Sequence, residues 1–141
     1  MLDTIYSQVA AAVMVMVCGF ALWKGEKTEH AGAAIYFLAW VLSLIVQDRI
    51  GYEGPQWVLM AVDVLVLAGF AELAWRSRRS WPIWAAAFQS IVLAIHVLSL
   101  AGLATNSLAF FAAQNLSAYG VLGSLAAGTW RAWRERDALQ F

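Results

Sequence analysis

Two ionisable side chains that could hold or pass a proton lie inside strongly apolar stretches of this sequence, Asp63 and His96. A carboxylate beside an imidazole can exchange a proton, because histidine titrates near neutral pH. Ionisable groups in an apolar environment are costly and usually have a function or a partner. Asp63 and His96 are therefore the first candidates for chemistry.

Other polar residues occupy comparable positions and extend this candidate site: Gln89, Gln114, Asn115 and Tyr119. On a helix, Gln89 would share a face with His96, and Tyr119 would follow Asn115 by one turn. Together these groups could form a small-ligand or proton-binding site. Alternatively, they hydrogen-bond one another and only hold helices together. The sequence leaves both interpretations open.

A third acid, Glu72, has a different predicted role. It precedes Arg76 by four residues, which is the favourable acid-first spacing for an ion pair on one helix. Because the pair lies where an apolar stretch gives way to basic residues, we expect a structural salt bridge at the end of a helix.

Cofactors and metals are not expected. His30 and His96 lie near opposite ends of their apolar stretches, so one chain cannot supply both axial ligands of a haem. Cys18 is the only cysteine, and no His, Cys and carboxylate cluster has the spacing of a metal site. Phosphate-binding glycine loops and nucleophile motifs are also missing, so we predict no enzymatic activity.

The composition decides the broad class of the protein. Of its 141 residues, 62% are hydrophobic and only 13% are charged, whereas soluble domains are about half apolar and about a quarter charged. A soluble fold of this size could not bury so much apolar surface. The net charge of zero gives no indication of a nucleic-acid partner. We therefore expect an all-α integral membrane protein that forms a single domain over residues 1–141.

Charged and turn-forming residues divide the chain into five apolar segments, each near the length of a transmembrane helix. They cover residues 4–23, 31–47, 56–75, 82–104 and 108–130, and a basic tail, residues 131–141, follows. One helix over residues 82–130 would be roughly 73 Å long, more than twice the hydrocarbon thickness. The polar residues Thr105, Asn106 and Ser107 therefore separate two spans, and the sequence predicts a bundle of five transmembrane helices.

The distribution of charge predicts the orientation of this bundle. With five spans, every Lys and Arg except Arg49 lies on one side of the membrane. The positive-inside rule makes this side cytoplasmic, with the N-terminus outside and the C-terminus inside. Tryptophans at the same boundary predict an aromatic belt: Trp23, Trp75, Trp81, Trp84, Trp130 and Trp133. We expect a multi-pass protein of the plasma membrane, here a bacterial inner membrane.

Small residues indicate how the last two segments pack. At four-residue spacing they are Ala86, Ser90 and Ala94 on the fourth segment and Gly120, Ser124 and Gly128 on the fifth. Such faces allow close helix contacts in lipid, so we expect a tight hairpin.

Two functions are compatible with this sequence. The first is a non-enzymatic accessory subunit or self-associating bundle, whose partners are the lipid bilayer and a membrane protein or a second copy. The second is binding or transport of a small molecule or a proton, through an outward-facing polar pocket around Asp63 and His96.

Overall fold

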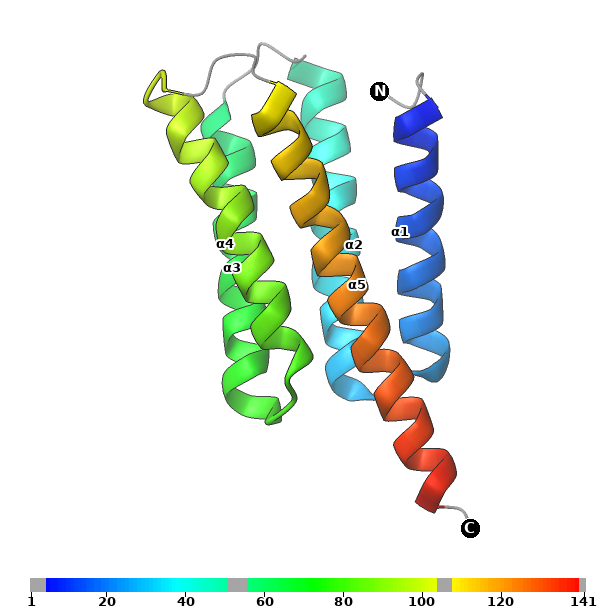
Figure 1. The fold of residues 1–141 in the computed structure, drawn as a ribbon. Coiled ribbons are helices and arrows are strands. Elements are labelled where there is room, and N and C mark those ends of the chain that lie inside the picture. Colours follow the sequence, from blue (N-terminus) through cyan, green and yellow to red (C-terminus); the bar gives the residue numbers. More distant parts are fainter. Residues whose placement is uncertain (1–4, 51–55, 104–107, 140–141) are drawn as a thin grey trace.

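The computed structural model describes residues 5–50, 56–103 and 108–139, and these residues form only helices and short turns (Figure 1). The helices are α1 (Ile5–Lys24), α2 (Lys27–Ile50), α3 (Gln56–Ser77), α4 (Trp81–Leu100) and α5 (Leu108–Leu139). Within the described residues, three stretches are long and apolar enough to cross a membrane, Lys27–Val46, Trp57–Ser77 and Trp81–Leu100. The predicted class, a helical bundle suited to a membrane, is confirmed at this level.

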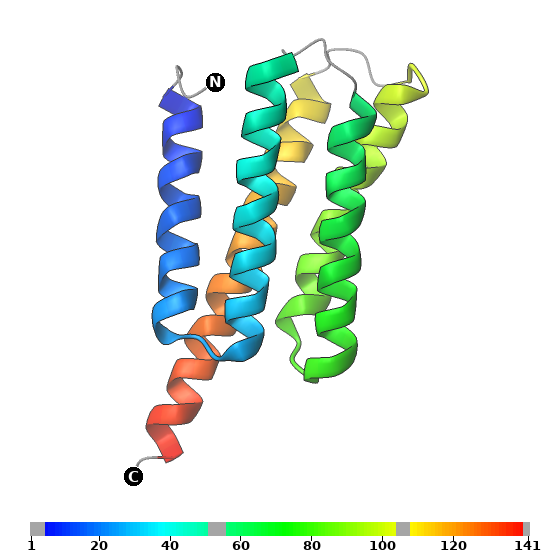
Figure 2. The ribbon, with the colours of Figure 1, turned by 180° about the vertical axis from the view of Figure 1, so that it is seen from behind.

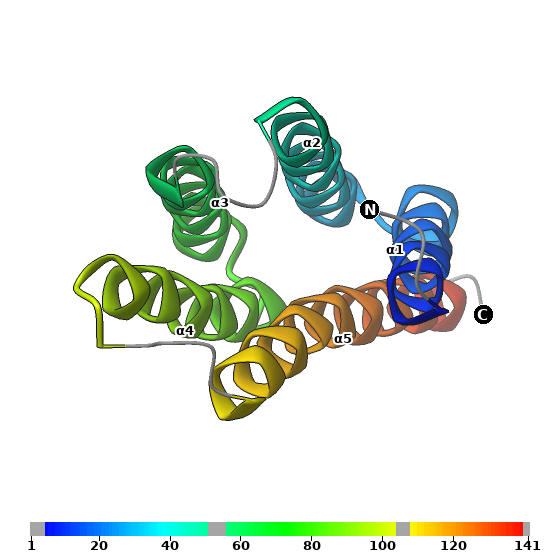
Figure 3. The ribbon, with the colours of Figure 1, turned by 90° about the horizontal axis from the view of Figure 1, so that it is seen from above.

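The helices follow one another around the bundle, and α5 returns to lie against α1 (Figure 3). Consecutive helices are antiparallel, whereas α1 and α5 run in the same direction. Helix α5 crosses the bundle at a tilt and extends beyond the other helices (Figures 1 and 2). We call the end with the start of α1 the N-terminal end of the bundle, and the opposite end the C-terminal end.

Helix α2 begins earlier than predicted, at Lys27 rather than at residue 31. The cause is a local cap, in which the backbone N–H of Glu26 donates to the carboxylate of Glu29 over 2.9 Å. This contact satisfies an N–H at the start of the helix, as in half of a capping box. The helix therefore extends beyond the predicted apolar segment, because the polar residues before it form the first turn of α2.

Helix α4 ends at Leu100, four residues before the predicted end of its segment. Gly102 adopts a φ of 73°, which a glycine reaches without strain. The N–H of Gly102 donates to the Ser99 carbonyl over 3.1 Å, and that of Leu103 donates to the Leu98 carbonyl over 3.0 Å. This double contact is a Schellman motif, which ends the helix.

The core consists of one buried stripe on each helix, spaced at three or four residues as expected for a helix facing its neighbours. Its residues include Met14, Cys18 and Ala21 on α1, Val62, Val66 and Phe70 on α3, and Val121, Leu122 and Leu125 on α5. Large apolar side chains cover the outside of the bundle, among them Leu65 and Leu116, which are 70% and 73% exposed. Such an exterior suits lipid as the surrounding solvent.

The contact between α4 and α5 differs from the predicted one. A Cβ atom on Gly128 would lie 2.2 Å from Trp81, and one on Gly120 would lie 2.6 Å from Phe88. Large aromatic rings of α4 therefore pack onto the glycines of α5, whereas Ser90 and Ala94 are exposed. The expected contact between two small-residue faces was wrong, because only one of the helices supplies small residues.

Trp81 is also not part of an aromatic belt, because it is only 3% exposed and lies in the core. Other predicted belt residues do face outward, with Trp23, Trp75 and Trp84 exposed by 76%, 89% and 62%. Near the C-terminal end, the ring of Trp133 on α5 lies 6.4 Å from that of Phe20 and joins α5 to α1.

Candidate functional site

Asp63 and His96 form a direct contact inside the bundle. The Nε2 atom of His96 lies 2.9 Å from Oδ2 of Asp63, and these side chains are 10% and 20% exposed. Gln89 completes the group by donating from Nε2 to Oδ1 of Asp63 over 2.8 Å. Each oxygen of this carboxylate thus has its own hydrogen-bond partner.

The helical geometry of α4 explains this arrangement. Gln89 and His96 are two turns apart on one face, so they are separated by roughly 10 Å along the helix axis. They belong to the buried stripe that also contains Ala85 and Val92. Asp63 projects from α3 between them, next to the buried Val62. Packing of α3 against α4 thereby brings the carboxylate between the amide and the imidazole.

The structure does not gather the α5 candidates around this carboxylate. The face of α5 that points inward contains Ser117, Val121 and Leu125. At about 100° per residue, Asn115 and Tyr119 lie away from that face, and both are exposed. Gln114 is half-buried. The outward-facing pocket with these side chains in its wall stays a prediction.

Glu72 and Arg76 do approach each other, with 3.1 Å between Oε1 and Nη2. Their side chains are 61% and 77% exposed, so the pair lies on the surface of α3 near the C-terminal end. Contacts of this kind contribute little free energy in water.

A second buried carboxylate, Glu29, was not found by sequence reasoning. Glu29 has no exposed surface. Its Oε1 accepts a hydrogen bond from the indole Nε1 of Trp81 over 2.9 Å and lies 3.5 Å from Nε of Arg79. Arg79 also binds Glu26, with 2.6 Å between Nη2 and Oε2. This network joins the start of α2 to the turn between α3 and α4.

Close packing around Trp81 holds this network in place. A Cβ on Gly32 would lie 2.3 Å from the indole, so α2 approaches the ring as closely as α5 does at Gly128. The ring of Phe70 lies edge-on at 6.2 Å. Residues from four helices thus meet at one tryptophan, and the indole N–H has a single direction in which to point.

One sequence signal could have indicated part of this second site. Glu29 follows Glu26 by three residues, which is the spacing of a reciprocal helix cap. Its contacts with Arg79 and Trp81 have no such signal, because they join residues about fifty positions apart and depend on how α2 packs against α4.

The two carboxylates differ in the chemistry open to them. The partner of Glu29 is a guanidinium, which stays charged at every physiological pH. The partners of Asp63 are an imidazole, a side chain that many proteins use to carry a proton, and a neutral amide. No cluster of three or more His, Cys, Asp or Glu side chains placed to hold a metal ion occurs among residues 5–50, 56–103 and 108–139.

Comparison of this chain with protein-family models, with curated proteins and with solved structures finds no match. The argument for function therefore depends on the residues themselves.

Proposed function

We propose that the chain crosses the membrane five times, with its N-terminus outside, and binds an exchangeable proton at Asp63 and His96. The proposal places the chain in the plasma membrane of a bacterium. Support comes from the basic residues, all of which except Arg49 belong to the C-terminal end of the bundle. Helix α1 contributes an apolar stretch, Gln8–Lys24, that is shorter than the three spanning stretches.

The observation that carries the proton-binding proposal is the 2.9 Å contact between Nε2 of His96 and Oδ2 of Asp63. With a neutral imidazole, this pair has one negative charge, which is costly in an apolar surrounding. Uptake of one proton gives an imidazolium beside a carboxylate and removes the net charge. Gln89 stays bound to Oδ1 in both states, so the carboxylate keeps its position.

Access to water is the second requirement for proton exchange. Asp63 lies two turns from the start of α3, and His96 lies one turn before the end of α4. At about 1.5 Å per residue, these positions are roughly 10 Å and 6 Å from the helix ends. The short distance for His96, caused by the early end of α4, favours exchange with the outer aqueous phase.

The test uses the fact that the chain contains only two histidines. In a His30→Gln variant, His96 gives the only imidazole ¹⁵N signal, which can be recorded by solid-state NMR in lipid vesicles. We expect this signal to change between the neutral and the protonated form as the outer pH is varied. The infrared carboxylate band of Asp63 should shift in the same steps, because its hydrogen-bond partner His96 changes charge.

The matched control for this test is Gln89→Leu, which removes the amide and leaves both titratable groups. It should keep the imidazole signal responsive to pH, whereas Asp63→Asn should remove the carboxyl band. If His96 keeps one protonation state at all pH values at which the protein stays folded, the pair is only a contact between helices and the proposal is wrong.

A role as an accessory subunit or self-associating bundle is the second candidate. Tyr119 lies on the outward face of α5 and is 40% exposed. A hydroxyl group that faces lipid favours a hydrogen bond with another helix. We expect the variant Tyr119→Phe to reduce the oligomer size measured by light scattering in mild detergent. The control is Leu65→Ala on the exposed side of α3; an unchanged size in Tyr119→Phe would exclude this face.

A further inference from the structure

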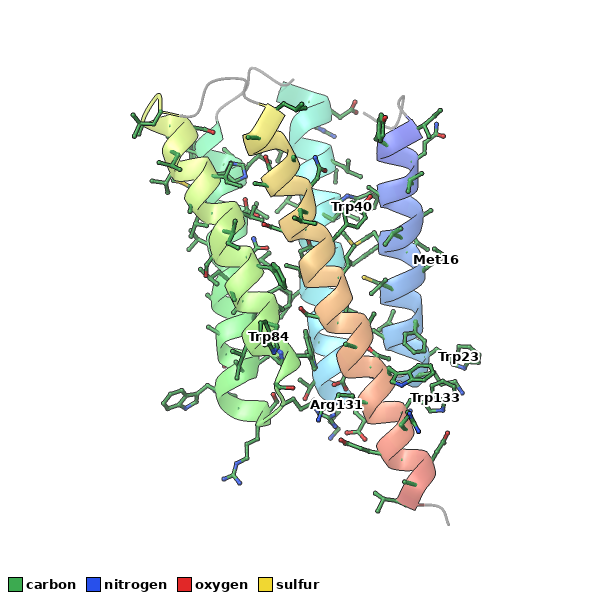
Figure 4. The ribbon with its side chains drawn as sticks, viewed as in Figure 1. Met16, Trp23, Trp40, Trp84, Arg131 and Trp133 are labelled. Atoms are coloured by element: carbon green, nitrogen blue, oxygen red, sulfur yellow. The ribbon has the colours of Figure 1, made fainter. Side chains whose placement is uncertain are left out.

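A groove of about 830 Å³ lies between α4 and α5 near the C-terminal end of the bundle. Its wall on α4 is aromatic and includes Trp84 and Phe88, and its wall on α5 consists of small residues such as Gly123 and Ala127. Figure 4 shows Trp84 on α4 and Arg131 farther down on α5, on the same side of the bundle. The groove thus has a section lined by aromatic rings and small residues and a polar end that contains arginines.

The basic end of the groove contains Arg78 and Arg131. Neither arginine forms an ion pair within the described part of the chain. Arg131 donates from Nη1 to the Ser80 hydroxyl over 3.1 Å, which holds its guanidinium beside the start of α4. Arg79, by contrast, is neutralised by Glu26 and Glu29.

The space in the groove results from the glycines of α5. Phe88 fills the position where a side chain on Gly120 would lie, but a Cβ added to Gly123 would meet no atom within 4 Å. Gly123 is also exposed. An apolar slot therefore remains open beside the rings of Trp84 and Phe88.

We propose that this groove binds an anionic phospholipid of the surrounding bilayer. The phosphate of its headgroup lies between Arg78 and Arg131, and one acyl chain lies in the slot beside Gly123. The combination of an unpaired basic end and an apolar length matches an amphiphile with a negative head. Glu135 also borders the groove, one turn beyond Arg131, and its charge disfavours a second phosphate there.

This inference uses the proposed topology in one respect, which is that the cytoplasmic leaflet supplies the lipid. It is independent of proton binding at Asp63, because Asp63 lies toward the N-terminal end of the bundle and the groove lies near the C-terminal end. An Asp63→Asn variant should bind lipid as the unchanged protein does, so failure of either proposal is recognised separately.

The test is native mass spectrometry of the full chain, delipidated in detergent and titrated with phosphatidylglycerol or phosphatidylcholine of identical acyl chains. We expect phosphatidylglycerol to be preferred, because the choline cation of phosphatidylcholine cancels the charge of its phosphate, and the preference should be roughly five-fold for each arginine beside the headgroup. The double variant Arg78→Gln, Arg131→Gln should lose this preference. The matched control Arg134→Gln changes an exposed arginine of α5 outside the groove and should keep it.

A second variant separates the slot from the charges. Gly123→Leu should fold normally, because the new side chain meets open space, and it should reduce binding of both lipids. The control Gly19→Leu places the same side chain on α1, where a Cβ also meets no atom within 4 Å. Equal binding of the two lipids, unchanged binding in Gly123→Leu, or equally tight binding of soluble glycerol phosphate would each overturn the proposal.

Discussion

Glu29 and Asp63 are two carboxylates inside one bundle, and their surroundings differ in every respect that determines chemistry. Glu29 has no exposed surface and is held by an arginine, an indole N–H and a backbone N–H. Asp63 is held by a histidine and an amide, and its side chain is 20% exposed. The first set of partners contains a guanidinium, which stays charged, whereas the second contains an imidazole and a neutral amide.

This difference assigns a structural role to the Glu29 network and leaves the Asp63 group as the candidate for chemistry. The Glu29 network joins α2 to the α3–α4 turn and lies against the best-packed part of the core around Trp81. Changing it should affect folding before anything else. The hydrogen bonds of the Asp63 group join α3 to α4, and Tyr36 of α2 lies near enough to interact electrostatically with the carboxylate.

The largest effect is expected for Trp81→Ala. This change removes a side chain that is 3% exposed and leaves Glu29 without its indole donor. Loss of a buried aromatic side chain costs about 3–5 kcal/mol of the free energy of unfolding. The measurement is thermal unfolding in detergent, followed by thiol labelling of Cys18, the only cysteine, which is 3% exposed. Trp84→Ala, at a position 62% exposed, is the control and should have little effect.

Arg79→Met should have the next largest effect, because it leaves the fully buried Glu29 without a positive partner. Removing one member of a buried pair costs about 3–5 kcal/mol, but the Arg79 side chain is 23% exposed. With solvent screening, we therefore expect roughly 1–3 kcal/mol in the same assay. Arg78→Met alters the neighbouring exposed arginine and serves as the control. Equal losses in the two variants would contradict the role given to Glu29.

Asp63→Asn should have a smaller effect on stability and a complete effect on proton exchange. An asparagine still offers a hydrogen bond to its neighbours, and such contacts between membrane helices contribute about 0.6 kcal/mol on average. The measurements are thermal unfolding and the infrared carboxyl band. Asp63→Leu provides the contrast, because Gln89 is 2% exposed and would lose its acceptor, at a cost of about 1–3 kcal/mol. A loss in Asp63→Asn as large as that in Arg79→Met would remove the distinction between the two sites.

Glu72→Gln should have the smallest effect. The Glu72–Arg76 pair is exposed, and exposed pairs one helical turn apart contribute about 0.3–0.5 kcal/mol. We expect the unfolding temperature to change by no more than the error between repeats. Raising the salt concentration should also leave the unfolding temperature of the original protein unchanged, because this exposed pair has little electrostatic energy for salt to screen. A clear destabilisation would mean that this pair touches a partner.

Several parts of the fold followed from the sequence with little ambiguity. Apolar length and composition were enough to predict membrane-type helices, because a bilayer requires long uninterrupted segments. The start of α4 followed from Pro82, which suits the first turn of a helix. Other ends were missed where a local motif decided them, such as the Schellman turn at Gly102. The contacts in these motifs each contribute a few tenths of a kcal/mol to about 1 kcal/mol to helix stability. Their positions cannot be predicted from the hydropathy of the sequence.

For the candidate site, residue type and position along the helix identified Asp63, Gln89 and His96, which the structure brings into contact. The same reasoning included Asn115 and Tyr119, which lie on the outward face of α5. The position of a residue along its helix can be counted from the sequence. The direction in which its side chain points depends on the neighbouring helices, and the sequence predicts it only weakly when most residues are apolar.

The sequence by itself determined the helical class, because long apolar segments with few charges are typical of helices that can cross a membrane. It also singled out Asp63 and His96 as ionisable groups that need partners inside the bundle, but it did not reveal Glu29. Only the tertiary structure decided who those partners are: His96 and Gln89 for Asp63, and Arg79 and Trp81 for Glu29. The physical reason is that such partners come from different helices, and close packing of glycines and aromatic rings fixes the rotation of each helix.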